Sequence, residues 1–131
     1  MKNILKVPLM FLCASPVFAA TLEWASEPVT TISKGQEIVV GYNVSSDKDL
    51  KWKHVNLHIC PIAEGPHCSK KVGRIDGPPM KGSIKAGETV YLTQTVIIPE
   101  DTPYGEYYMV GHGFLDKKNL FTEERILKYQ E

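Results

Sequence analysis

This sequence lacks three features that would point directly to a function class: a catalytic motif, a surplus of basic charge and a second long hydrophobic run. Its 131 residues contain no glycine-rich phosphate loop, nucleophile elbow or zinc-protease helix. Fifteen Lys and Arg residues balance fifteen Asp and Glu residues, so no basic excess is present to hold phosphates. After residue 20 no apolar run is long enough to span a bilayer. We therefore expect a non-enzyme with no cofactor, no nucleic-acid partner and no stable membrane span.

The one long apolar run lies at the N-terminus. Lys2 and Lys6 give a positive start, Val7–Phe18 is mostly apolar, and Ala19 is a small residue suited to cleavage. This pattern predicts a secretory signal peptide over residues 1–19, with an uncleaved anchor as the alternative. Its removal leaves 112 residues, with 13 basic and 15 acidic side chains, as a single domain over 20–131. We expect an extracellular, lumenal or periplasmic protein.

Cysteine is scarce, and its positions fit that compartment. Only three Cys residues occur, and Cys13 falls within the predicted signal peptide. Cys60 and Cys68 remain as an even number in an oxidising location, which predicts a disulfide between them. The alternative is a zinc or copper site formed by both cysteines with His58 and His67, since four nitrogen and sulfur ligands suit these metals. We prefer the disulfide and expect no metal.

The chain consists of short alternating apolar segments separated by turn residues, and no convincing helix follows residue 20. In the segment 54–59, Val, Leu and Ile alternate with His, Asn and His, which is typical of a half-buried strand with exposed histidines. Further strands are expected around 22–26, 38–44, 70–75, 90–98, 107–115 and 120–129. This pattern predicts an all-β, immunoglobulin-like antiparallel β-sandwich of about seven strands.

A rigid corner separates two of these strands. Pro99 and Pro103 lack a backbone donor and do not fit the middle of a sheet, and Gly105 suits a tight turn. A Tyr just after such a corner can hydrogen-bond back to the chain, as in the tyrosine corner of sandwich domains. Tyr107 is our candidate for this role, and Tyr104 is the alternative.

The segment from Lys85 to Val96 (KAGETVYLTQTV), followed by Ile98 to Tyr107 (IPEDTPYGEY), resembles the C-terminal half of the ML lipid-recognition family. It is most similar to the fungal phosphatidylglycerol/phosphatidylinositol transfer proteins, which have a K-x-G-D turn, a strand, a P-x-x-x-P-x-G-x-Y corner and a final hairpin. The resemblance implies a small secreted β-sandwich that holds a lipid or sterol between its two sheets.

Two functions of different class follow. The first is a lipid or sterol carrier whose ligand lies between the sheets. Its candidate cavity lining is Val40, Tyr42, Val55, Leu57, Leu92, Val96, Tyr108, Val110, His112 and Phe114. His112 lies between two glycines, which could leave room for a ligand. The alternative is a binding or adhesion module with a solid core that acts through its loops or edge strands. The sequence does not identify the ligand, a protein partner, the oligomeric state or glycosylation at the Asn43 sequon.

Overall fold

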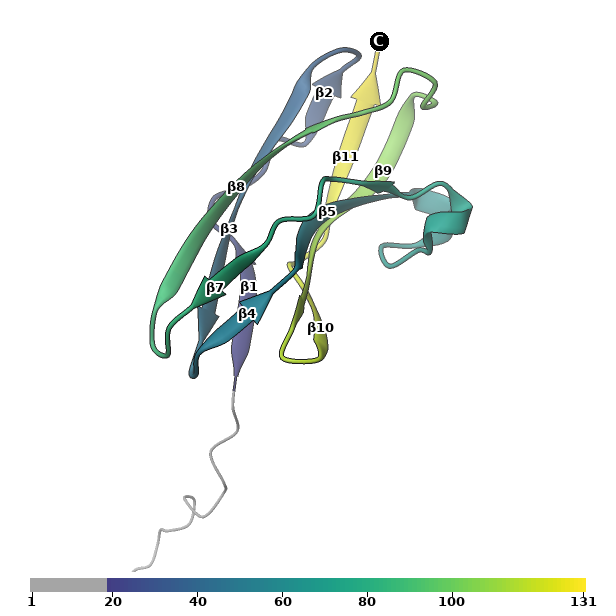
Figure 1. The fold of residues 1–131 in the computed structure, drawn as a ribbon. Coiled ribbons are helices and arrows are strands. Elements are labelled where there is room, and N and C mark those ends of the chain that lie inside the picture. Colours follow the sequence, from purple (N-terminus) through teal and green to yellow (C-terminus); the bar gives the residue numbers. More distant parts are fainter. Residues whose placement is uncertain (1–18) are drawn as a thin grey trace, which may run out of the picture.

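The computed structural model describes residues 19–131, so the expected signal peptide lies outside the described residues except for its last position. Two β-sheets face one another across one hydrophobic core (Figure 1). The smaller sheet has the order β1 (Ala20–Trp24), β3 (Glu37–Ser46), β8 (Thr89–Ile97). The larger has the order β2 (Thr31–Ser33), β11 (Arg125–Gln130), β9 (Gly105–Leu115), β5 (His54–Pro61), β6 (Ile75–Asp76).

The remaining elements lie at the margins of these two sheets. β10 (Lys118–Phe121) pairs with the second half of β9, while β11 pairs with its first half. β4 (Leu50–Trp52) and β7 (Gly82–Ile84) form a two-stranded sheet. The two 3-10 turns are η1 (Ile62–Glu64) and η2 (Lys70–Val72). Every described strand pair is antiparallel except β2 with β11.

The predicted all-β sandwich is confirmed. Residues 19–131 contain eleven strands, but four of these, β2, β4, β6 and β7, are only two or three residues long, so seven longer strands remain. Two strand predictions were wrong. The segment 70–75 is mainly the η2 turn, and the final strand is split at Thr122, which is buried and bonds back to Gly111 through both its backbone and its hydroxyl.

The rigid corner has the predicted anchor. The Tyr107 hydroxyl donates to the Pro103 carbonyl, four residues upstream, and the side chain is only 7% exposed. Tyr104 is 47% exposed and is not the anchor. Burial raises the pKa of Tyr107 above its usual value. The hydroxyl therefore remains a hydrogen-bond donor at neutral pH and ties the start of β9 to the corner.

Tyr107 lies on the inner face of β9, and this placement corrects four of the lining predictions. Tyr107, Met109 and Leu115 belong to the core, and because side chains alternate along a strand, positions 108, 110, 112 and 114 face outward. Tyr108, Val110, His112 and Phe114 therefore do not line the space between the sheets. Phe114 is 47% exposed, and the His112 ring stacks on His58, which is also on the outer face.

The disulfide between Cys60 and Cys68 is confirmed, with the two Cα atoms 6.0 Å apart. It ties the start of residues 61–74, the covering segment, to the end of β5, and this segment lies over the outer face of the larger sheet. Residues 75–80 pair with the free edge of β5. Asn56 Nδ2 donates to the Gly77 carbonyl at 2.8 Å, and Arg74 Nη1 donates to the Cys68 carbonyl at 3.1 Å. Because of this cover, His58 is only 8% exposed and the expectation of a solvent-exposed His58 was wrong, whereas His54 is exposed.

A buried glutamine joins the two sheets directly. Gln94 lies on the inner face of β8 and is 5% exposed. Its Oε1 accepts the Leu57 N–H of β5 at 2.9 Å, and its Nε2 donates to the Pro78 carbonyl. The edge formed by β8 and β5 is therefore closed by hydrogen bonds. Of the helices among residues 19–131, none has the length and apolar character needed to cross a membrane.

Candidate functional site

Six of the predicted lining residues do lie between the sheets. Five of them (Val40, Tyr42, Val55, Leu57 and Val96) are at most 3% exposed, and Leu92 is partly buried and packs against the same core. The two glycines of β9 point into this interior, where a Cβ at Gly111 would collide with the Tyr42 ring. Neighbouring side chains fill the space that these glycines leave. The role of the six residues as a ligand lining stays a prediction.

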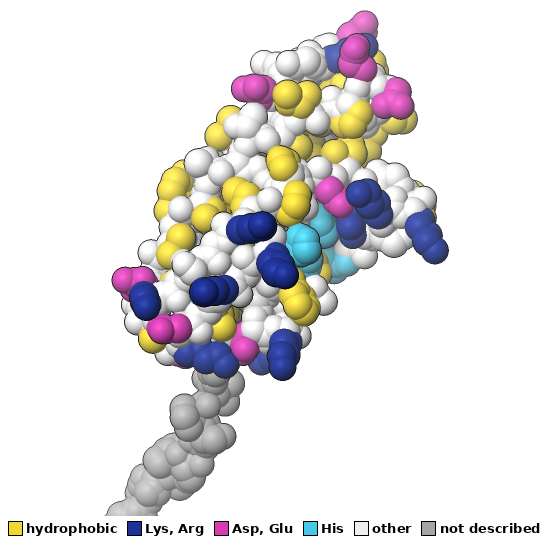
Figure 2. Space-filling model, in the orientation of Figure 1, with side chains coloured by type: hydrophobic (Ala, Val, Ile, Leu, Met, Phe, Trp, Pro, Cys, Tyr) yellow, Lys and Arg dark blue, Asp and Glu magenta, His cyan; other side chains and the backbone are white. Residues whose placement is uncertain are grey.

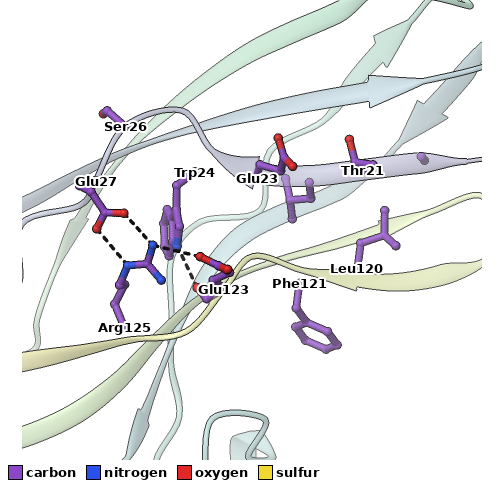
Figure 3. A pocket seen from close by; sticks show the side chains of 11 residues that line it. Thr21, Glu23, Trp24, Ser26, Glu27, Leu120, Phe121, Glu123 and Arg125 are labelled. Atoms are coloured by element: carbon purple, nitrogen blue, oxygen red, sulfur yellow. Dashed lines mark hydrogen bonds and ion pairs between the residues drawn. The ribbon is translucent and has the colours of Figure 1, made fainter.

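An open groove lies at the opposite edge of the sandwich, where β1 of the smaller sheet faces β10 and the start of β11 (Figure 3). We call it the edge groove. It has a volume of about 700 Å³ and is lined by Ala20, Thr21, Leu22, Glu23, Trp24, Ser26, Glu27, Leu120, Phe121, Glu123 and Arg125. Leu22 and Trp24 come from β1, and Leu120 and Phe121 come from β10. The groove therefore has an apolar wall contributed by both sheets.

One end of the edge groove is closed by polar contacts. The Arg125 guanidinium donates to both carboxylate oxygens of Glu27, at 2.6 and 3.0 Å, and to Glu123 at 3.3 Å. The Trp24 indole N–H donates to the Glu123 carbonyl at 2.8 Å. Figure 3 shows these side chains meeting between β1 and β11. The hydrogen bonds from Arg125, and to a smaller extent its charge, hold the pKa of the exposed Glu27 carboxyl below its usual value, so Glu27 is ionised at neutral pH.

Beneath the groove lies a buried tyrosine. The Tyr42 ring stacks on Trp24, with ring centroids 5.6 Å apart. Tyr42 is fully buried, and its hydroxyl makes no hydrogen bond with the described residues. Burial raises the pKa of this hydroxyl, which keeps it protonated. An unpaired hydroxyl in a protein interior is rare and costs free energy. The ring that carries this hydroxyl stacks on Trp24, which lines the groove.

Sequence reasoning did not identify this groove. Leu22 and Leu120 are 98 positions apart in the chain, and no spacing rule relates them. Trp24 was assigned only to the first strand, and Arg125 only to the last. One signal in the sequence could have pointed to the groove. A Trp that is partly buried needs a hydrogen-bond acceptor for its indole N–H, so Trp24 indicated that another segment lies against the first strand.

The residues considered for a metal site are not arranged for one. Both cysteines are in the disulfide, which removes the thiolates of the zinc or copper alternative. Within the part of the chain that the structure describes, no group of three or more His, Cys, Asp or Glu side chains could hold a metal ion. The alternative metal site formed by His58, Cys60, His67 and Cys68 was therefore wrong.

Comparisons with known proteins show similarity in fold but not in sequence. No protein-family model matches the chain, and no curated protein matches its sequence. A Niemann-Pick type C2 protein from Japanese carpenter ant is 13% identical with a TM-score of 0.58, over 86% of this chain and 98% of that one. This likeness over nearly the whole of the second chain supports an ML-like fold.

Two further solved structures share the sandwich as part of a longer chain. A β-glucosidase from Listeria innocua, in complex with isofagomine, is 10% identical with a TM-score of 0.63, over 87% of this chain. The sporulation control protein Spo0M from Bacillus subtilis is 13% identical with a TM-score of 0.58, over 88%. The present chain spans only 16% of the glucosidase and 51% of Spo0M, so these matches concern the fold alone.

Proposed function

We propose that this protein is an exported carrier that binds a neutral lipid or sterol in the edge groove and carries out no catalysis. The observation that carries the proposal is the apolar wall formed by the partly exposed Trp24 and Leu120, from facing strands of the two sheets, over the buried Leu22. The groove's volume of about 700 Å³ lies within the roughly 300–1,000 Å³ typical of small-molecule sites. Burial of the ligand's apolar surface against this wall supplies the main binding energy.

The charges around the groove favour an uncharged ligand. The groove is lined by three carboxylates and one cation, which are Glu23, Glu27, Glu123 and Arg125. An anionic head group there would meet a net negative rim, and Arg125 already bonds to two carboxylates. A hydroxyl head, as in a sterol or a fatty alcohol, needs no counter-charge.

The lipid class is supported by the resemblance of residues 85–107 to the ML family and by the ML-like fold. The Cys60–Cys68 disulfide supports an oxidising, extracytoplasmic location, as expected for a chain with an N-terminal signal peptide. An exported carrier of this size meets its ligand at membranes or in lipid particles. The ligand enters from the side, because Gln94 ties the other edge of the sandwich closed.

Contact quenching of tryptophan emission tests the proposal. The chain has two tryptophans, of which Trp24 lines the groove and Trp52 is buried outside it. A brominated sterol should quench the wild type with a saturable curve, and Trp24→Phe should lose this quenching. Leu120→Glu places a charge on the apolar wall, so we expect at least about a tenfold weaker affinity.

The matched control is Val39→Glu, which adds the same charge to an exposed apolar position, 56% accessible, on β3. It should leave sterol affinity unchanged. Absence of saturable quenching in the wild type, or equal loss in Leu120→Glu and Val39→Glu, would contradict the proposal.

A second candidate function is a protein-binding module that acts through β8. This strand lies at the end of its sheet, carries no charged residue, and exposes Tyr91 and Ile97, each 62% accessible. Such an edge can pair with a strand of another chain. The quenching experiment separates the two candidates, because a module of this kind binds no sterol at Trp24.

A further inference from the structure

All four histidines of the chain meet in one pocket on the outer face of the larger sheet. His54 and His58 come from β5, His112 from β9, and His67 from the covering segment inside the disulfide loop. The pocket, which we call the histidine pocket, has a volume of about 420 Å³, and Arg74 and Asn119 also line it. Figure 2 shows histidine side chains gathered together on this face, next to basic side chains.

The rings in the histidine pocket form a continuous row of contacts, of which the His58–His112 pair is stacked and the other two pairs are tilted. The His58 and His112 rings have centroids 4.7 Å apart, the His112 and Phe121 rings 5.1 Å, and the Phe121 and His67 rings 4.2 Å. His112 is further oriented by a hydrogen bond of 2.8 Å between its Nε2 and Asn119 Oδ1. These ring contacts orient the imidazoles around the pocket.

His58 has an unused hydrogen-bonding capacity. The residue is 8% exposed; neither ring nitrogen makes a hydrogen bond with the described residues, and neither is among the fully buried side-chain atoms that lack a partner. The nearest acidic group is Asp76, whose Oδ1 is 3.8 Å from His58 Nε2. Both oxygens of Asp76 are already taken by the Arg74 guanidinium, at 2.6 and 3.2 Å. The His58 ring is therefore able to donate a hydrogen bond to a ligand that enters the pocket.

The electrostatic field at His58 is positive. Burial lowers the pKa of His58 most, and the charge of Arg74 and the neighbouring His112 and His67 lower it further, while only Asp76 raises it. Lys70 Nζ is a second cation near Asp76, at 3.9 Å from its Oδ2. One carboxylate therefore faces two cations, Arg74 and the exposed Lys70, beside a group of histidines, the residue type whose charge ordinarily changes between pH 5 and 8.

We propose that the histidine pocket binds a small oxyanion, such as a phosphate, sulfate or carboxylate group, more tightly at pH 5.5 than at pH 7.5. His58 and His67 donate ring N–H groups to the anion, and Asn119 donates its amide N–H. An anion among these side chains accepts hydrogen bonds from the His58 ring and its neighbours and supplies the negative charge that the field favours. Since each added proton on the imidazoles strengthens the attraction, anion binding and proton uptake are coupled.

A metal ion fits this arrangement less well than an anion. His58 and His112 are stacked with an angle of 26° between their planes, so their in-plane lone pairs run side by side and do not converge on one point. The residues that the structure describes contain no group of three ligands suited to a metal. The cationic Arg74 next to the pocket also repels a metal ion.

Calorimetric titration of the full protein with sodium phosphate and with sodium sulfate, at constant ionic strength in chloride, tests the inference. We expect saturable binding at pH 5.5 and at least about tenfold weaker binding at pH 7.5, because uptake of a single proton can change affinity by up to about tenfold per pH unit. His112→Gln and His67→Gln, which keep polar side chains but cannot take up a proton, should each reduce this pH dependence. Lys85→Gln removes a positive charge from a side chain that is 78% exposed and outside the pocket, so it should change nothing.

Two further titrations identify the source of the anion. Binding of free phosphate without binding to vesicles of phosphatidylcholine and phosphatidylglycerol supports a soluble anion as the ligand. Binding to these vesicles that is lost in His112→Gln supports a lipid head group. Absence of saturable phosphate and sulfate binding at pH 5.5, or saturable binding of Zn²⁺ alone that is tighter at pH 7.5, would overturn the proposal. A negative result in these titrations does not bear on the proposed sterol site, since quenching of Trp24 tests the edge groove and not the histidine pocket.

Discussion

At the scale of single residues, His58 shows how a neighbouring segment changes the chemistry of a strand. The side chain is on the polar face of β5, yet the disulfide-bonded covering segment leaves it 8% exposed. Its pKa falls from the ordinary value of 6.5 to about 4, first through burial and then through the charge of Arg74. His58 is therefore neutral in the folded protein at neutral pH.

We predict that this buried histidine makes the fold less stable in acid. The unfolded chain takes up the proton near pH 6.5, whereas the folded protein does so only near pH 4. His58 thus contributes stability that is fully present above about pH 6.5 and is lost as the pH falls towards 4. We expect a decrease of roughly 1–3 kcal/mol from this residue, measured by urea unfolding in a buffer without phosphate or sulfate.

His58→Gln should show a shallower loss of stability between pH 7 and pH 4 than the wild type. The control is His54→Gln at an exposed position, which should keep the wild-type slope of stability against pH. Titration of the carboxylates contributes equally to the slopes of the wild type and both variants. Identical slopes for all three proteins would show that His58 takes up its proton as easily in the folded state as in the unfolded one.

At the scale of elements, β9 organises the larger sheet. It pairs with β5 along one side and with β11 and then β10 along the other. Gly111 lies where these two partners change over, and Thr122 bonds to its backbone there. Because Gly111 has no side chain, the Tyr42 ring of the opposite sheet fits against the strand.

We predict that Gly111→Ala destabilises the protein by roughly 1–3 kcal/mol, because the added methyl group would overpack the contact with Tyr42 and Thr122. The matched control is Gly41→Ala on β3, whose methyl group would meet Tyr91, a side chain that is 62% exposed and free to move. Thermal or urea unfolding measures both. Equal stability of the two variants would mean that Tyr42 shifts without cost.

At the scale of the whole molecule, the two edges of the sandwich differ. At the edge formed by β8 and β5, the buried Gln94 side chain joins the sheets by hydrogen bonds. At the edge formed by β1 and β10, the sheets leave the edge groove, closed only at one end by Arg125 and its carboxylates. Of these two edges, the second is therefore the open one.

We predict that Gln94→Leu destabilises the protein by about 1–3 kcal/mol, since the buried Leu57 N–H loses its acceptor. Thr95→Val, on the exposed face of the same strand, should change stability by less than about 0.5 kcal/mol. The comparison is made by urea unfolding. A stable Gln94→Leu variant would show that another group replaces the lost acceptor and that the closed edge does not depend on this side chain.

The sequence by itself determined the features that depend on local pattern. Alternation over residues 54–59 predicted a strand with one apolar face, and the two cysteines eight positions apart predicted their own disulfide. The prolines and glycine of the corner, followed by Tyr107, predicted the hydrogen bond to the backbone upstream. Each of these follows from conformational limits or pairing within a few residues.

Only the tertiary structure decided the features that depend on which surfaces meet. Both faces of β9 carry apolar residues, Tyr107 and Met109 on one and Tyr108 and Val110 on the other, so hydrophobic pattern alone could not identify the inner face. The edge groove and the histidine pocket each combine strands from distant parts of the chain. Such sites arise from the packing of sheets and loops, and no local spacing in the sequence encodes which side chains that packing brings together.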